Sequence, residues 1–175
     1  MLRSIIFVAL SLAATTSVFA SIPKPMASRS ASKLIPERGH ELVFTVNYST
    51  KQLKDFPLQM VTKAKLTLAK NTSGLLTAKW KATILDIREE KTVEAEASAI
   101  CRAPNRKRME CVFSSDEGTA ILTANSDGVL ITIPVGQGIR FDKKGEEGEG
   151  MVWAEMLLGT DIENNHFQLA AKKNR

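Results

Sequence analysis

From residue 41 onward, apolar and polar side chains alternate along much of the chain. The clearest run separates five apolar residues by hydrophilic ones, with Leu76, Ala78, Trp80, Ala82 and Ile84 set against Thr77, Lys79, Lys81 and Thr83. Shorter runs of the same kind span residues 42–48 and 63–68. Successive side chains of a β-strand point to opposite faces, so this period of two predicts strands with one buried and one solvated face, as in antiparallel sheets.

Turn-forming residues separate these runs. The turn signals are Asn71 to Gly74, Ser114 to Gly118, Asn125 to Gly128 and Pro134 to Gly138. Strands joined in series by short turns form a meander, and the spacing indicates about eight to ten strands. The pattern therefore predicts a single all-β domain over residues 39–175. A closed or half-open barrel would remove the exposed strand edges, and a two-sheet sandwich is the alternative.

Three stretches have less decisive patterns. Residues 89–99 are rich in Glu and Ala, as helices are, but Thr92 and Val93 favour a strand. Residues 150–159 fit either a helix or a strand, and we prefer the strand. Residues 50–60 are expected to form a loop or a short helix that covers one end of the sheet.

The chain has two cysteines, Cys101 and Cys111. The alternation on either side of this pair puts both cysteines on the apolar face. If residues 105–107 form a three-residue hairpin loop, the two cysteines oppose each other directly, within disulfide reach. One even pair of cysteines in an exported chain therefore predicts one disulfide, which pins the register of one hairpin.

The first twenty residues have the pattern of a secretory signal peptide. Arg3 precedes an apolar run over residues 5–14, and residues 18–20 have the small-x-small form of a signal-peptidase site. The apolar run is shorter than the roughly 20 residues that a membrane-spanning helix needs. We therefore expect a signal peptide over residues 1–20 and a mature chain, periplasmic or extracellular, without a membrane span. Residues 21–38, rich in proline and basic side chains, are expected to be a flexible leader.

Residues typical of catalysis or metal binding are sparse. The two histidines, His40 and His166, lie far apart in the sequence, and neither has a second ligand at a metal-site spacing. Residues 142–150 gather four acidic side chains, which could serve calcium, but the loop matches no EF-hand, and a solvated loop is the preferred interpretation. We therefore predict no catalytic residue, no metal site and no cofactor.

The charge of the chain is modest, at a formal net +5, but basic side chains gather in two places. The predicted hairpin tip carries Arg102, Arg106, Lys107 and Arg108. A basic hairpin of this kind could contact an anionic partner of the cell envelope, while the lack of interleaved aromatic residues argues against specific nucleic-acid binding. A second basic surface, with Lys63, Lys65, Lys79 and Lys81, forms if their two strands pair.

These features lead to two hypotheses of function and leave an enzyme as the third. The first is an exported, non-enzymatic binding protein that holds a hydrophobic or amphipathic ligand, such as a lipid, inside a barrel. Its lining would include Leu66, Leu68, Leu76, Trp80 and Ile84. Small residues on the same face, such as Ala78 and Ala82, would leave room for a ligand or let two sheets approach closely. The second is an interaction module that docks an anionic partner through the hairpin 102–108.

Overall fold

The computed structural model describes residues 30–86, 91–113, 118–143, 155–158 and 165–172, and it is built almost entirely of β-strands. Its elements are the 3₁₀ helix η1 (Ala31–Leu34), the helix α1 (Thr50–Asp55) and the strands β1 (Glu41–Asn47), β2 (Val61–Lys70), β3 (Leu76–Asp86), β4 (Lys91–Arg102), β5 (Met109–Phe113), β6 (Thr119–Ala124), β7 (Gly128–Thr132), β8 (Gly138–Lys143), β9 (Glu155–Leu158) and β10 (His166–Ala171). All strand pairings are antiparallel.

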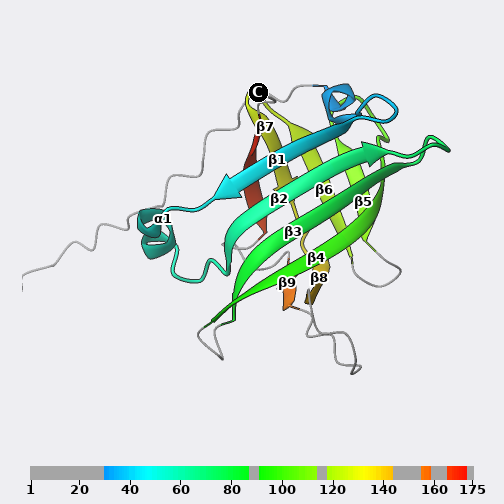
Figure 1. The fold of residues 1–175 in the computed structure, drawn as a ribbon. Coiled ribbons are helices and arrows are strands. Elements are labelled where there is room, and N and C mark those ends of the chain that lie inside the picture. Colours follow the sequence, from blue (N-terminus) through cyan, green and yellow to red (C-terminus); the bar gives the residue numbers. More distant parts are fainter. Residues whose placement is uncertain (1–29, 87–90, 114–117, 144–154, 159–164, 173–175) are drawn as a thin grey trace, which may run out of the picture.

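Eight of these strands close into a barrel. Figure 1 shows this barrel from the side of β1 to β4. Strands β1 to β7 follow one another around it, and β10 closes the ring between β7 and β1. The longest contact joins β3 to β4, from Leu76 opposite Cys101 to Asp86 opposite Lys91. The predicted antiparallel meander and barrel are therefore confirmed, and the alternative of a two-sheet sandwich is wrong.

The remaining two strands form an antiparallel pair that extends the sheet beyond the ring, and Ile139 and Phe141 of β8 belong to the same core. Strand β8 pairs with β4 at Ala95 and Glu96, nearer the start of β4 than the part that pairs with β5. Strand β9 pairs with β8. The long strand β4 thus pairs with both β5 and β8 along the same edge. Because β5 is short, this extra pairing covers backbone groups of β4 that would otherwise be left open.

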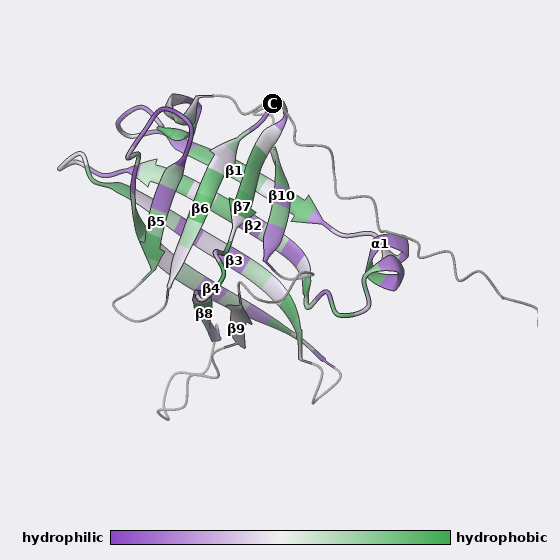
Figure 2. Ribbon diagram, turned by 180° about the vertical axis from the view of Figure 1, so that it is seen from behind, coloured by the Kyte–Doolittle hydropathy of each residue, from purple (hydrophilic) through white to green (hydrophobic). Residues whose placement is uncertain are grey.

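Apolar side chains fill the interior of the barrel. The alternation along the strands is visible as bands of hydrophobic and hydrophilic residues in Figure 2. The inward positions of β2 and β3, from Ala64 to Leu68 and from Leu76 to Ile84, are all buried and belong to one continuous core. An eight-stranded barrel is just wide enough for its side chains to fill, so the single core is the expected result of this strand number.

The N-terminal segment packs on the barrel from residue 31 onward. Ala31 and Leu34 of η1 are each about 1% exposed, and the side chain of Ser30 caps the helix. Part of the segment 21–38, predicted to be a flexible leader, is therefore ordered against the core, because two apolar residues three apart in this short helix face the same side. The predicted signal peptide over 1–20 lies outside the described residues.

The three ambiguous stretches are resolved where the structure describes them. Strand β4 begins at Lys91, so the strand interpretation of residues 91–99 is correct. Residues 155–158 form β9, as preferred, and Thr50–Asp55 forms the short helix α1 with a capping box between Ser49 and Gln52. Most of the acidic loop 142–150 lies outside the described residues. Across the described ranges, no helix has the length and apolar character needed to span a membrane.

Candidate functional site

A cross-linked hairpin carries the basic tip that we take as the candidate site. Cys101 of β4 and Cys111 of β5 form a disulfide, with their Cα atoms 4.0 Å apart and directly opposite each other in the register. Both cysteines are buried in the core. The predicted disulfide is thus confirmed, and the turn that follows it is anchored to the barrel by a covalent bond as well as by strand pairing. This cross-link is consistent with an oxidising, exported environment.

Hydrogen bonds hold the tip of this hairpin in one conformation. The side-chain oxygen of Asn105 accepts from the backbone N–H of Lys107 at 2.9 Å and from that of Arg108 at 3.2 Å. On the other side, the backbone N–H of Ala31 in η1 donates to the carbonyl of Arg106 at 2.7 Å. The tip is therefore closed by a local Asx-type turn and also supported by the N-terminal segment.

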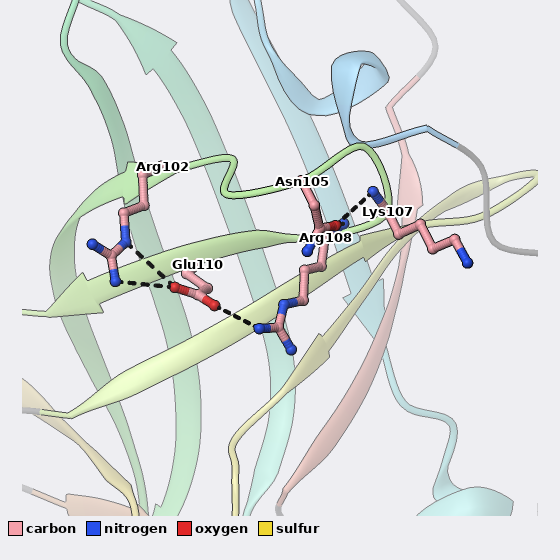
Figure 3. A network of polar contacts seen from close by, with 5 residues as sticks. All are labelled: Arg102, Asn105, Lys107, Arg108 and Glu110. Atoms are coloured by element: carbon pink, nitrogen blue, oxygen red, sulfur yellow. Dashed lines mark hydrogen bonds and ion pairs between the residues drawn. The ribbon is translucent and has the colours of Figure 1, made fainter.

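Two arginines of the hairpin share one carboxylate, as Figure 3 shows. Arg102 donates from Nε and Nη2 to Oε2 of Glu110, at 3.3 and 3.2 Å. Arg108 approaches the other oxygen of Glu110 with its Nη2 at 3.1 Å. The side chain of Glu110 is only 18% exposed, whereas the side chains of Arg102 and Arg108 are 75% and 49% exposed. We call Arg102 and Arg108, oriented in this way by Glu110, the arginine clamp.

The electrostatics of the clamp leave it available for an anion. Each guanidinium has five N–H donors in a fixed plane, and Glu110 uses only some of them. Arg106 and Lys107 add two more positive charges, and the ion pairs within the described residues involve neither of them. In Figure 3 the side chain of Lys107 extends away from Glu110. Four positive charges against one negative charge suit a phosphate or carboxylate.

Glu110 was missed by the sequence reasoning, although a signal for it was present. The predicted register places Cys101 opposite Cys111, and this same register places Arg102 opposite Glu110. Opposite charges directly across an antiparallel pair attract each other. The structure places the four basic residues at the end of the hairpin, and the sequence reasoning missed the acid that orients two of them.

The predicted interior residues all lie inside the barrel. Leu66 and Leu68 of β2, and Leu76, Trp80 and Ile84 of β3, are between 0% and 9% exposed. The indole of Trp80 occupies the centre of an aromatic cluster that sequence reasoning missed. Its ring centroid lies 5.1 Å from that of Phe141, 5.2 Å from that of Phe167 and 6.4 Å from that of Phe113. Side chains brought from four strands thus take up the space next to the small inward alanines.

The indole N–H of Trp80 is a buried polar group without a hydrogen-bond partner among the described residues. A buried donor without a partner costs about 1–3 kcal/mol. Edge-to-face contacts with Phe141 and Phe167 place aromatic rings around the indole, and these offer at most a weak acceptor. The indole therefore presents an unused hydrogen-bond donor inside the barrel.

The second basic surface forms on the outer face of β2 and β3. Lys65 and Lys81 are directly opposite each other in the register. Glu96 of β4 accepts a 3.1 Å hydrogen bond from Lys79 and lies 3.6 Å from Lys81, and the bond from Lys79 lowers the pKa of Glu96. The predicted pairing of these strands is therefore correct. Glu96 offsets part of the lysine charge.

The two histidines do not share a site. His40 precedes β1 and His166 begins β10, and these antiparallel strands place them at opposite ends of the barrel. In the part of the chain that the structure describes, no three His, Cys, Asp or Glu side chains come together as a metal ion would require. Comparisons of the chain with protein-family models, with curated proteins and with solved structures gave no match.

Proposed function

We propose that this chain is an exported, non-enzymatic binding protein that docks an anionic partner of the cell envelope through the hairpin 102–108. The barrel fold is compatible with a binding protein. The observation that carries the proposal is the arginine clamp, in which one carboxylate orients two exposed guanidinium groups. Planar forks held in position lose little conformational freedom when they meet a phosphate or carboxylate, so their donors favour such a partner.

The test uses tripolyphosphate as a probe and calorimetric titration of the full mature chain. Replacing Arg106 and Lys107 by glutamate reverses two charges at the tip without touching the clamp or the disulfide. We expect binding of the unmodified chain and a loss of affinity of roughly tenfold or more in the variant, because repulsion replaces attraction next to the clamp. The reversal leaves the core unchanged, so circular dichroism should show the same fold.

A matched control comes from α1. Lys51 and Lys54 are exposed lysines of this helix, which Figure 1 shows well apart from η1 and the hairpin tip that η1 supports. Reversing both changes the net charge by the same amount as the tip variant. Affinity should then stay within about twofold of the original value, since screening weakens interactions beyond roughly 10 Å. Equal losses in both variants would mean that net charge alone governs binding, and the proposal would be rejected.

A second candidate is a hydrophobic or lipid-like ligand inside the barrel, lined by Leu66, Leu68, Leu76, Trp80 and Ile84. Such a ligand would have to displace aromatic side chains that fill the core in this structure. The observation that favours it is the unpartnered Nε1 of Trp80, which could donate to an oxygen of such a ligand. Native mass spectrometry of protein purified from its exported compartment, followed by organic extraction, tests it. A reproducible added mass that extracts as lipid and disappears in Trp80→Phe would support this candidate, and a bare polypeptide would count against it.

A further inference from the structure

A groove on the outside of the barrel begins next to the arginine clamp. It has a volume of about 840 Å³ and lies across the outer face of β2, β3, β4 and β5. Ile100 of β4 and Val112 of β5 line it, and these two residues are directly opposite each other in the register. Two residues further along each strand, on the same face, stand Arg102 and Glu110. The groove and the clamp are therefore neighbours on one surface.

Ile100 and Val112 are unusual for the solvated face of a sheet. Ile100 is 56% exposed and Val112 is 47% exposed, and Leu75, just before β3 at the same end, is 40% exposed. Most other outward positions of β2 to β4 carry Lys, Thr, Ser or Glu. Single exposed apolar residues need no explanation, but a directly opposed pair inside a groove is a contiguous apolar surface that a ligand could cover.

Cations lie on both sides of this apolar pair. The clamp stands at one end, and Lys79, Lys81 and Lys65 line the groove further along the strands. Lys65 faces Lys81 directly across the β2–β3 pair, and like charges so placed repel each other. Glu96 is shared by Lys79 and Lys81, while the ion pairs within the described residues leave Lys65 without a partner. Glu41 of β1 also lines the groove, so its lining has three lysines against one acidic residue, next to the apolar pair.

We propose that this groove binds the apolar chain of a single anionic amphiphile whose acidic headgroup lies on the arginine clamp. This inference rests on the proposed function and names the class of its partner. Exposed apolar side chains next to oriented guanidinium groups are complementary to a molecule with an alkyl chain and a phosphate or carboxylate head. The opposed pair of Ile100 and Val112 is a small apolar surface next to the guanidinium groups, which a single alkyl chain can cover.

The experiment compares two alkyl phosphates that share a headgroup and differ in chain length. Ethyl phosphate and octyl phosphate, the latter below its micelle-forming concentration, are titrated calorimetrically into the full mature chain. The longer chain adds six methylene groups. If half of that added surface is buried in the groove, octyl phosphate should bind on the order of 50-fold more tightly than ethyl phosphate.

Variants of the groove then test where the alkyl chain of the ligand binds. Ile100→Thr with Val112→Thr keeps branched side chains at exposed strand positions and removes apolar surface from the groove. In this double variant, the preference for octyl phosphate over ethyl phosphate should fall about tenfold. Its affinity for ethyl phosphate should stay the same. Val135→Thr is the control, because Val135 is 80% exposed in the connection between β7 and β8 and does not line the groove. The control should keep the full preference.

The outcomes separate this inference from the proposed function. Equal affinities of the unmodified chain for the two phosphates would overturn the amphiphile inference and leave the anionic docking site intact. A preference for octyl phosphate that survives in the Ile100 and Val112 double variant would also overturn it, since the alkyl chain would then bind elsewhere. If neither alkyl phosphate nor tripolyphosphate binds, the proposed function fails, and this inference fails with it.

Discussion

Glu110 orients two of the three arginines of the hairpin, Arg102 and Arg108. A guanidinium on a free side chain samples many positions, and holding it in one of them costs conformational entropy when a ligand binds. Here the partly buried side chain of Glu110 orients Arg102 and Arg108 before any partner arrives. Lysine could supply the same charge, but it has no planar fork to share between a carboxylate and a ligand.

This difference between arginine and lysine gives the first prediction at the residue scale. Arg108→Lys keeps the charge of the clamp and removes its fork, so affinity for tripolyphosphate should fall roughly fivefold. Lys107→Arg, made on the neighbouring residue that extends away from Glu110, should leave affinity nearly unchanged. Calorimetry on both variants measures the effect. An unchanged affinity in Arg108→Lys would mean that only net charge matters at the tip.

Tyr48 gives the second prediction, because it is the only tyrosine in the chain. Burial raises the pKa of Tyr48 to about 12, compared with an ordinary value of 10.0. Tyrosinate absorbance in the near ultraviolet should therefore titrate near pH 12 in the folded protein and near pH 10 in denaturant. A folded-state midpoint near pH 10 would contradict the packing of this partly buried ring against the core.

The same group should make stability depend on pH. Above about pH 10 the unfolded chain loses the Tyr48 proton while the folded chain keeps it, so the free energy of unfolding falls as pH rises. The stability that protonated Tyr48 contributes to the free energy of unfolding is fully present below pH 10. Roughly 2–3 kcal/mol of this stability is lost by pH 12. Urea unfolding of Tyr48→Phe, which cannot ionise, should lack this part of the decline.

At the residue scale the sequence predicted positions better than contacts. The two cysteines, the four basic residues of the tip and the inward position of Trp80 all follow from alternation and a short turn. The contacts of Trp80 with Phe113, Phe141 and Phe167 do not, because strand alternation states which face a residue occupies but not which distant strand faces it across the barrel. The contact of Glu110 with Arg102 can be predicted only by extending the hairpin register from the pair Cys101–Cys111 to the next pair towards the turn.

At the scale of elements, the hairpin of β4 and β5 is the structure on which the site depends. Replacing Cys101 and Cys111 together by alanine should lower the free energy of unfolding by about 2–3 kcal/mol, the value expected for a short closed loop. Chemical unfolding of the oxidised protein and the double variant measures this. A change well below 1 kcal/mol would show that strand pairing alone fixes the hairpin.

Element prediction succeeded where the signals were local and failed where partners were distant. The alternation and the turn signals correctly predicted the order β1 to β7. The insertion of β10 between β7 and β1, and the pairing of β8 with β4, depend on contacts between segments far apart in the sequence. The burial of Ala31 and Leu34 was missed for the same reason, because the segment's proline-rich and basic composition hid two apolar residues that meet the barrel.

At the scale of the whole molecule, the closed and filled barrel leaves its outer face and its ends as the places for binding. A closed ring leaves few strand edges, and a core with Trp80 at its centre fills the space that a larger barrel would keep for a ligand. Recognition then falls to the outer face and the ends, where the hairpin, η1 and the outer groove lie together. The central claim is that an anion binds at this end, on Arg102 and Arg108.

Heteronuclear NMR of the folded protein tests that claim most directly, because it follows individual N–H groups while tripolyphosphate is added. The account predicts that the Nε–H signals of Arg102 and Arg108 shift most, saturably and in parallel with the backbone amides of residues 105–108. Unmoved arginine signals, with the largest shifts at the indole N–H of Trp80 or on a surface away from the hairpin, would contradict it.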